Sequence, residues 1–167
     1  MPLADRAVPW IADPSEYSRS QINAVWHVIL GHFFPGTKYA ITDCWHGYDP
    51  AEEDSHRDLM VSLATETCTD MAVFTLQPLC NDWTDATDHL LWSLNDIWNT
   101  ACDPRAEQDT LYGVVVIGLE CEIFSCSRNH RTLVNYLSSR PLHVQHDRRQ
   151  LSMTLHFIAR KIAADNE

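Results

Sequence analysis

DTLYGVVVIGLECEIFSC, residues 109–126, carries the strongest structural signal in the chain. Residues 114–117 are its longest unbroken run of β-branched side chains, which are stiff at χ1 and suit a strand buried on both faces. Gly118 interrupts the run, as a bulge or a sharp bend requires. Residues 119–124 then alternate with the period of two that is typical of a strand with one wetter face. The stretch predicts two strand segments at the centre of an α/β or α+β domain.

Apolar residues recur at helical spacing in three other parts of the chain, and each part has a start or stop signal. Pro35-Gly36 ends the first part, and Thr84 caps the second. Asp147 and Gln150 have the spacing of a capping box at the start of the third. The predicted helices span residues 22–33, 84–102 and 147–162.

Alternating or β-branched runs predict further strands, and one polar segment predicts a short helix. The predicted strands span residues 38–46, 59–67, 71–79 and 141–145, and the short helix lies within residues 127–139. Short polar connections between the first three strands favour antiparallel pairing. The long helix that follows them then requires a crossover to the central stretch. The predicted fold is α/β (α+β), with a mixed central sheet of about 4–6 strands flanked by helices.

The length and the prolines set the domain organisation. The chain has 167 residues, a size typical of one domain. Pro2, Pro9 and Pro14 favour an extended N-terminal arm over residues 1–18. We therefore predict this arm and a single α/β domain over residues 19–167.

The chain is acidic, with 23 Asp and Glu against 12 Lys and Arg and a formal net charge of −11. This balance argues against non-specific nucleic-acid binding, which needs a basic face. Arg140, Arg148 and Arg149 form one basic cluster, which we interpret as a solvated helix start. The sequence predicts no membrane span and no signal peptide, and hence an intracellular protein of the cytoplasm or nucleus with reduced cysteines. The expected partner is another protein or a second copy of the chain.

The predicted element order resembles the restriction-endonuclease-like, or PD-(D/E)xK, fold, whose members share a helix, three strands, a helix and a fourth strand. The stretches YGVVVIGLECEIF (112–124) and LHVQHDRRQLSMTLHFIARKI (142–162) are similar to those of uncharacterised fungal proteins with that fold. The family places an acid on the second strand or the turn after it, and a Glu/Asp-x-Lys triplet on the third strand. The resemblance implies that such carboxylates would hold a divalent metal and that the lysine would help to activate water.

In this chain the resemblance implies a degenerate catalytic motif. Thr75 stands where the family has the second acid, and Gln77 stands where it has the lysine. Asp70 is a candidate first acid, and Asp43 and Asp58 are alternatives that lack the triplet behind them. One acid alone cannot supply the charge that a Mg²⁺ site needs, so the resemblance implies a pseudoenzyme.

Other polar residues offer alternatives outside the resemblance. Glu120 and Glu122 are two apart on a predicted strand and share a face, where a like-charged pair could shift a pKa for acid–base work or form a solvated surface. Cys44, His46 and His56 are candidate metal ligands, but they lack the closely spaced pairs usual in zinc sites. We therefore predict no cofactor, and Mg²⁺ or Mn²⁺ only if the protein is an active nuclease.

Further residues bear on cysteine and histidine chemistry. Cys44, Cys121 and Cys126 are candidate nucleophiles if folding brings a histidine and an acid close to one of them. His143 and His146 are three residues apart, so on the predicted edge strand they would face opposite sides.

Six tryptophans are a high count for this length, and they divide into two groups. Trp26 and Trp98 fall on the apolar stripes of predicted helices and are expected in the core. Others lie on loops or off the main stripes, as tryptophans at interfaces and in ligand pockets do. The candidate binding residues are Trp45, His46, Trp83 and Trp92.

The leading hypothesis is a non-catalytic binding or regulatory module on a degenerate nuclease-like fold, which recognises a protein partner or forms a homo-oligomer. One alternative is a metal-dependent nuclease with a migrated active site, which predicts acids and a basic residue converging at one sheet end. The other is a small-molecule enzyme with an apolar cavity and convergent polar groups. Its predicted pocket consists of Cys44, His46, Glu120 and Glu122.

Overall fold

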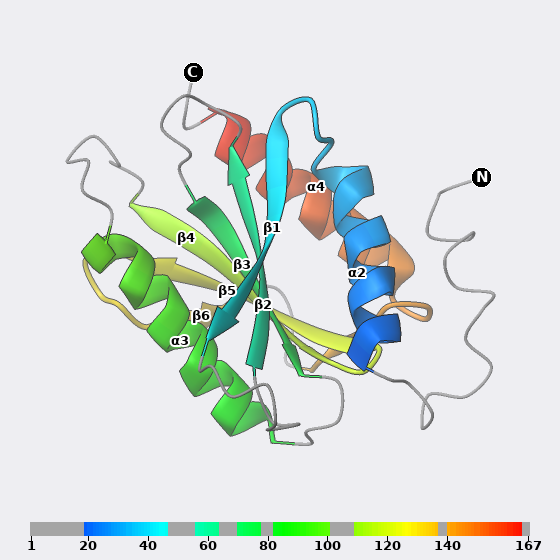
Figure 1. Cartoon of the computed structure of the whole chain (residues 1–167), viewed down its shortest axis with the longest axis horizontal. Helices are drawn as coiled ribbons and strands as arrows, with labels where there is room; N and C mark the ends of the chain where they lie inside the picture. The colour runs from blue at the N-terminus through cyan, green and yellow to red at the C-terminus, as the bar shows by residue number, and fades with distance from the viewer. Residues whose placement is uncertain are drawn as a thin grey trace.

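A computed structural model describes residues 19–46, 56–63, 70–77, 82–100, 109–136 and 140–164, and for residues 19–20, 43–46, 56–58, 62–63, 70–77 and 100 it describes the backbone alone. The predicted arm, residues 1–18, lies outside the described residues. The elements are α2 (Arg19–Phe33), β1 (Tyr39–His46), β2 (His56–Leu63), β3 (Asp70–Gln77), α3 (Trp83–Thr100), β4 (Thr110–Ile117), β5 (Glu120–Ser127), β6 (Leu133–Asn135), β7 (Leu142–His143) and α4 (Arg148–Ala164) (Figure 1). None of the described helices is long and apolar enough to cross a membrane.

The described strands form one seven-stranded sheet in the order β1-β2-β3-β4-β5-β6, and β7 also pairs with β5. The pairs are antiparallel except for β3 and β4, which run parallel. A parallel pair needs a crossover connection, and α3 lies within the connection between these two strands. The prediction of a mixed sheet flanked by helices is confirmed, and the short strands β6 and β7 raise the strand number above the predicted range.

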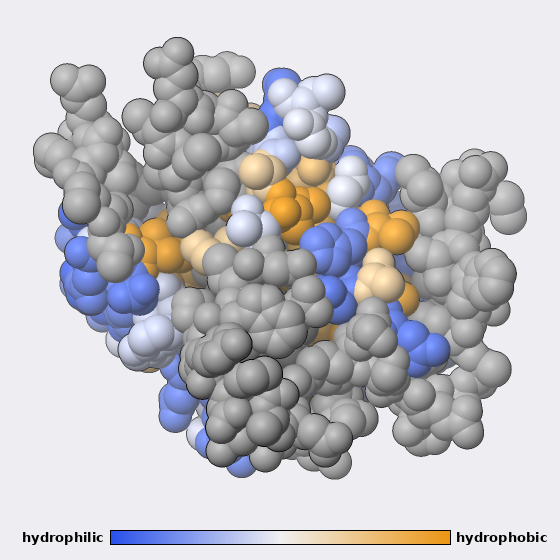
Figure 2. All heavy atoms as spheres, viewed as in Figure 1, coloured by the Kyte–Doolittle hydropathy of each residue, from blue (hydrophilic) through white to orange (hydrophobic). Residues whose placement is uncertain are grey.

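Helices cover both faces of the sheet, with α2 and α4 on one side and α3 on the other (Figure 1). Residues 114–117 place buried side chains on both faces of the sheet, as their unbroken β-branched run predicts. Val114 and Val116 belong to the core beneath α2 and α4, and Val115 belongs to the core beneath α3. The outer side of α3 is hydrophilic in the view of Figure 2.

The predicted helix stripes are the buried ones. In α2 the apolar residues at helical spacing are all buried, and Trp26 and Leu30 have no exposed surface; the set is Ile22, Val25, Trp26, Ile29, Leu30 and Phe33. In α4 the apolar stripe of Leu151, Leu155, Ile158 and Ile162 is buried together with Thr154 and Ala159. Trp98 of α3 is also buried. Because each stripe faces the sheet, the periodicity of the sequence is sufficient to orient all three described helices.

Gly118 makes the tight turn between β4 and β5. Ile117 pairs with Glu120, so the loop has only two residues, Gly118 and Leu119. Gly118 has φ +61°, whereas Leu119 is not among the residues with positive φ. Positive φ at the first loop position alone fits a type II′ hairpin turn, which favours glycine there. The predicted sharp bend is confirmed.

Local predictions fail where pairing with a distant strand decides the structure. The short helix expected within 127–139 is wrong, because Leu133–Asn135 pair with β5 as strand β6. The strand expected at 141–145 is shorter than predicted and consists of β7 alone.

The cap of α3 is Asp82, whose Oδ1 accepts hydrogen bonds from the backbone N–H groups of Thr84 at 2.8 Å and Asp85 at 3.4 Å. Thr84 is therefore not the cap.

Candidate functional site

The sheet does not gather the predicted catalytic acids. Asp43 lies on β1, Asp70 begins β3, and Glu120 and Glu122 lie on β5. Three strands separate β1 from β5, which is roughly 19 Å at the usual strand spacing. The small-molecule pocket is therefore not formed, because its two halves lie on these distant strands. That failed prediction comprises Cys44, His46, Glu120 and Glu122.

The environment of β5 does not favour nucleophilic or paired-carboxylate chemistry. Burial raises the pKa of the Glu122 carboxyl, so the shift comes from desolvation, whereas the expected origin was the neighbouring Glu120. Burial also raises the pKa of the Cys121 and Cys126 thiols, which are both enclosed in the core. A thiol whose pKa is raised supplies little thiolate, so neither cysteine is poised as a nucleophile.

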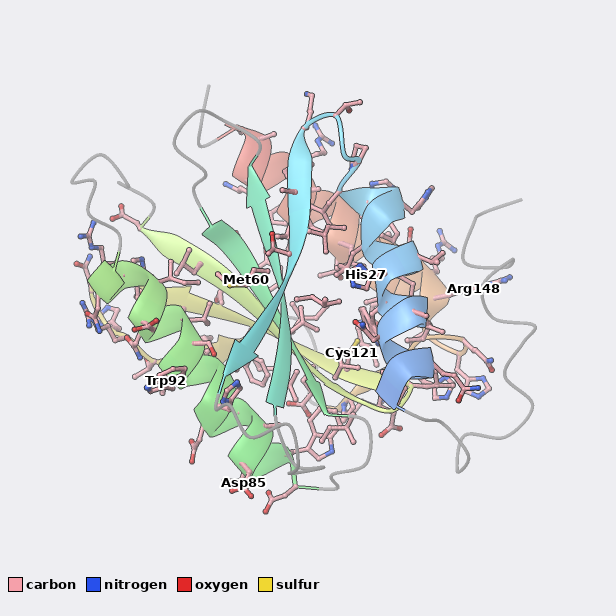
Figure 3. All side chains as sticks on the ribbon, viewed as in Figure 1. His27, Met60, Asp85, Trp92, Cys121 and Arg148 are labelled. Carbon is pink, nitrogen blue, oxygen red and sulfur yellow. The ribbon has the colours of Figure 1, made fainter. Side chains whose placement is uncertain are left out.

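The candidate binding tryptophans on α3 do not form one site. Trp83 is half-buried and packs against the core beneath α3. Trp92 is 54% exposed and stacks on His89 with ring centroids 6.0 Å apart (Figure 3). Nine residues along a helix turn the side chain by about half a circle, so the two tryptophans lie on different sides of α3. Trp45 and His46 lie on β1, opposite Arg57 and His56 of β2.

Among the side chains that the structure describes, no group of three His, Cys, Asp or Glu residues could hold a metal ion. The predicted ligands Cys44, His46 and His56 lie on the paired strands β1 and β2, for which the backbone gives the register.

A pocket outside the predicted sites lies beside the start of α4. Its volume is about 700 Å³, within the range of small-molecule sites. We call it the α4 groove. It is lined by Tyr136, His146, Asp147, Arg148, Arg149, Gln150, Met153, Thr154 and Phe157.

Aromatic and thioether side chains form the apolar wall of the α4 groove. Met153 and Phe157 are one helical turn apart on α4, and they are 65% and 44% exposed. The Tyr136 ring lies 5.9 Å from Phe157 and 5.7 Å from the buried Tyr112, so a row of rings runs from the core to the surface. The backbone N–H of Tyr136 donates to the Ile123 carbonyl at 2.8 Å, which fixes this residue to β5. The wall is therefore anchored in the fold.

Two exposed arginines form the basic end of the α4 groove. Arg148 and Arg149 are the first residues of α4, whose first turn contains no acidic residue. The N-terminus of a helix carries partial positive charge, so cations there are unfavourable for helix stability. The same partial charge adds to the two guanidinium groups in attracting an anion. The position of both arginines therefore suits anion recognition better than it suits folding.

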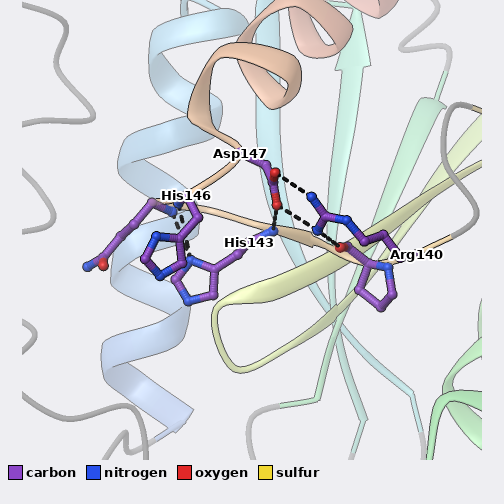
Figure 4. A network of polar contacts seen from close by, with 6 residues as sticks. Arg140, His143, His146 and Asp147 are labelled. Carbon is purple, nitrogen blue, oxygen red and sulfur yellow. Dashed lines mark hydrogen bonds and ion pairs between the residues drawn. The ribbon is translucent and has the colours of Figure 1, made fainter.

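A polar network holds the chain in front of α4 (Figure 4). Both Asp147 carboxylate oxygens accept hydrogen bonds from Arg140, and Oδ2 also accepts one from the backbone N–H of His143 at 2.9 Å. These bonds hold the pKa of the Asp147 carboxyl at about 2, and the Arg140 hydrogen bond is the largest cause. The carboxylate is thus engaged within the chain, and the arginines of α4 dominate the charge of the groove.

His143 and His146 come together, contrary to the sequence expectation. Their ring centroids are 4.4 Å apart, because the chain turns immediately after the two-residue strand β7. His143 Nδ1 accepts hydrogen bonds from the backbone N–H groups of Gln145 at 3.1 Å and His146 at 3.4 Å, so this nitrogen is unprotonated. Burial, and then the charge of His146, lower the pKa of His143. His143 is therefore a structural residue of the turn.

Comparisons with protein-family models, with curated proteins and with solved structures found no match for this chain. The interpretation of the protein's function therefore depends on the geometry of the α4 groove. One signal in the sequence could have indicated this groove: Met153 and Phe157 lie off the buried stripe of α4, one turn apart, and Met153 comes four residues after Arg149.

Proposed function

We propose that the protein is a non-catalytic binding module, and that the α4 groove recognises an acidic segment of a protein partner that also carries apolar side chains. The single observation that supports it most strongly is the combination of Met153 and Phe157, both well exposed, with Arg148 and Arg149 at one end of the same pocket. Exposed aromatic and Met side chains beside arginines are the residue types enriched where proteins bind one another.

The charge of the α4 groove determines which kind of partner segment it favours. The chain as a whole has a net charge of −11, so it repels acidic partners everywhere except at local basic patches. The α4 groove is such a patch, because its one acidic lining residue, Asp147, is bound by Arg140. A partner segment with carboxylates at one end and apolar side chains along its length complements both parts of the groove.

The proposal extends to the scaffold, which we place with the restriction-endonuclease-like fold in a degenerate form. What supports this is the element order helix, three strands, helix and strand, and the residues Thr75 and Gln77 at the positions of the expected acid and lysine. Incubation with DNA and RNA in the presence of Mg²⁺ or Mn²⁺ should give no cleavage. Cleavage that Asp70→Ala abolishes would instead identify an active nuclease.

Selection from a random library of displayed 12-residue peptides tests the binding function. We expect the selected peptides to be enriched in Asp and Glu together with aromatic or aliphatic residues. A selected peptide, labelled for fluorescence anisotropy, should lose affinity by about tenfold or more with Phe157→Ser, which removes an exposed aromatic anchor. Arg149→Glu should weaken binding by about fivefold or more at low salt, and added salt should reduce this difference.

Two matched variants control for general surface effects. Arg160→Glu reverses an exposed charge on α4 outside the groove, and Trp92→Ser removes an exposed aromatic side chain from α3. Neither should change peptide affinity. Equal losses in these controls, or selected peptides without acidic residues, would contradict the proposal. Self-association that Phe157→Ser disrupts would assign the groove to a second copy of the chain instead.

A further inference from the structure

His143 caps a helical turn that leads into α4 (Figure 4). The backbone N–H of Asp147 donates to the His143 carbonyl at 2.8 Å, so residues 143–147 form one turn with helical spacing. Within this turn His143 Nδ1 accepts hydrogen bonds from the backbone N–H groups two and three residues later, those of Gln145 and His146. This is the bonding of an N-cap side chain, a position where Ser, Thr, Asp and Asn are preferred. His143 differs from these residues because its ring can take up a proton near neutral pH.

A proton on His143 is incompatible with this cap. A neutral imidazole has one nitrogen that accepts hydrogen bonds, and Nδ1 has that role here, so the ring takes up its proton at Nδ1. The imidazolium donates hydrogen bonds but accepts none, so both cap bonds must break. A cation at the start of a helical turn also faces the partial positive charge of the N–H groups there. Protonation of His143 therefore favours an open turn.

The charged groups that face the His143 ring come from β5 and from the turn itself. The His146 ring lies 4.4 Å away, and burial, followed by the charge of His146, lowers the pKa of His143. Glu120 on the paired strand β5 and Asp147 in the turn act in the opposite direction, but the net shift is downward. The contribution of the cap to stability is therefore present above the ordinary pKa of 6.5, and it is lost as pH falls through the lower pKa of the folded protein.

The turn capped by His143 positions the basic end of the α4 groove. His146 and Asp147 line the groove, and Arg148 and Arg149 follow them directly as the first residues of α4. The pKa of the Asp147 carboxyl is about 2, so its bonds to Arg140 persist where histidine titrates. The cap bonds are thus the part of this network that mild acidification breaks, and the backbone they hold leads directly to both arginines.

We propose that the α4 groove is regulated by pH: protonation of His143 opens its capped turn and weakens binding of the acidic partner segment. This inference rests on the proposed function of the groove. Added positive charge alone would strengthen attraction to an acidic segment, but surface charges are screened by salt. Opening the turn lowers the fraction of the protein whose groove has the binding geometry, and this effect reduces the apparent affinity. We expect affinity to fall about threefold to tenfold between about pH 7.5 and about pH 5.5, as the loss of one cap predicts.

NMR of the free, full-length protein tests the turn without a partner. Above neutral pH, the nitrogen shifts of His143 should show the tautomer with its proton on Nε2, as the cap requires. On acidification the His143 ring and the backbone amides of Gln145 and His146 should change with one midpoint below 6.5. The Arg149 amide and the Met153 methyl group, which report on the groove, should follow the same midpoint. His146→Asn should raise the midpoint, because it removes a charge that lowers the pKa of His143.

Binding of a selected acidic peptide to the full chain tests the regulation. His143→Asn keeps an N-cap oxygen but removes the group that titrates, so its affinity should be nearly the same at the two pH values. His143→Ala removes the cap itself and should bind more weakly than His143→Asn at the higher pH. His130→Asn removes an exposed histidine outside the turn and should keep the decrease on acidification. Every protein is measured with the same peptide, so titration of the peptide carboxylates affects all of them equally.

The outcomes distinguish this inference from the proposed function on which it rests. Failure to select acidic peptides contradicts the binding function, and NMR of the free protein still decides whether His143 controls the turn and the groove. Titration of His143 that leaves the amides of Gln145 and His146 unchanged overturns the inference. Affinity that increases on acidification, or a decrease that His143→Asn retains, also overturns it but leaves the binding function intact. Coincident NMR midpoints, with a decrease in affinity that His143→Asn abolishes, support it.

Discussion

Arg140 and Asp147 are joined by two parallel hydrogen bonds, from Nη1 to Oδ2 at 2.9 Å and from Nη2 to Oδ1 at 2.7 Å. Such bidentate ion pairs are the geometrically specific form of the arginine–carboxylate contact. The pair connects a residue two positions before β7 to the residue before α4, and its Asp147 lines the α4 groove. It therefore controls both the charge and the backbone path of this surface.

We expect Arg140→Gln to raise the pKa of the Asp147 carboxyl from about 2 toward its ordinary value of 3.8. The folded pKa lies below the ordinary value, so the stabilising contribution of this carboxylate is present above about pH 3.8 and is lost as pH falls through about 2. NMR titration of the Asp147 carboxyl carbon in both proteins measures the shift. Arg160→Gln is the control, and an Asp147 pKa unaffected by Arg140→Gln would show that the ion pair does not set it.

Two glycine substitutions should change stability in opposite directions. Gly118→Ala should lower the free energy of unfolding by about 1–2 kcal/mol, because an L side chain is strained at φ +61°. Gly31→Ala should raise it by about 0.5–1 kcal/mol, because Gly31 lies in α2 with no atom within 4 Å of an added Cβ. Urea unfolding of the two variants measures both changes. Equal effects of the same sign would contradict the type II′ turn.

The contact between α3 and β4 leaves no room for a side chain at Gly113. An added Cβ would lie 2.7 Å from both Leu90 Cδ atoms, and Leu90 has no exposed surface. Gly113→Ala should therefore cost about 1–3 kcal/mol through overpacking. Leu90→Ala alone should cost about 2–5 kcal/mol through the cavity that it leaves. In a double-mutant cycle, the double variant should lose less than the two single losses together, whereas simple additivity would argue against this contact.

The Cys121 thiol should react only when the protein unfolds. It is completely buried between the sheet and the helices α2 and α4, and burial raises its pKa. Alkylation by iodoacetamide, followed by mass spectrometry of the peptide that contains Cys121, should increase in parallel with global unfolding as urea is added. Rapid alkylation of Cys121 in native buffer would contradict its burial and reopen a nucleophilic role.

The sequence is sufficient for those parts of the fold that depend on local periodicity. The stripe that includes Trp26 and Leu30 and the β-branched run 114–117 both identify buried faces correctly. The sequence is insufficient where the outcome depends on a distant partner: Leu133–Asn135 are a strand only because β5 offers an edge. The opposition of His46 and His56 likewise depends on a register that no local pattern defines. The α4 groove required the position of Tyr136 relative to Phe157, which only the packed chain provides.

The parallel seam between β3 and β4 divides the described sheet into two meanders, β1–β2–β3 and β4–β5–β6. The strands of each meander can pair through contacts that are close in sequence. Pairing β3 with β4 also requires the long connection through α3 to close, which costs more chain entropy. Joining the two meanders is therefore the entropically costly event of folding. The gain in buried surface from α3 comes only at that moment, because its core draws residues from both sides of the seam.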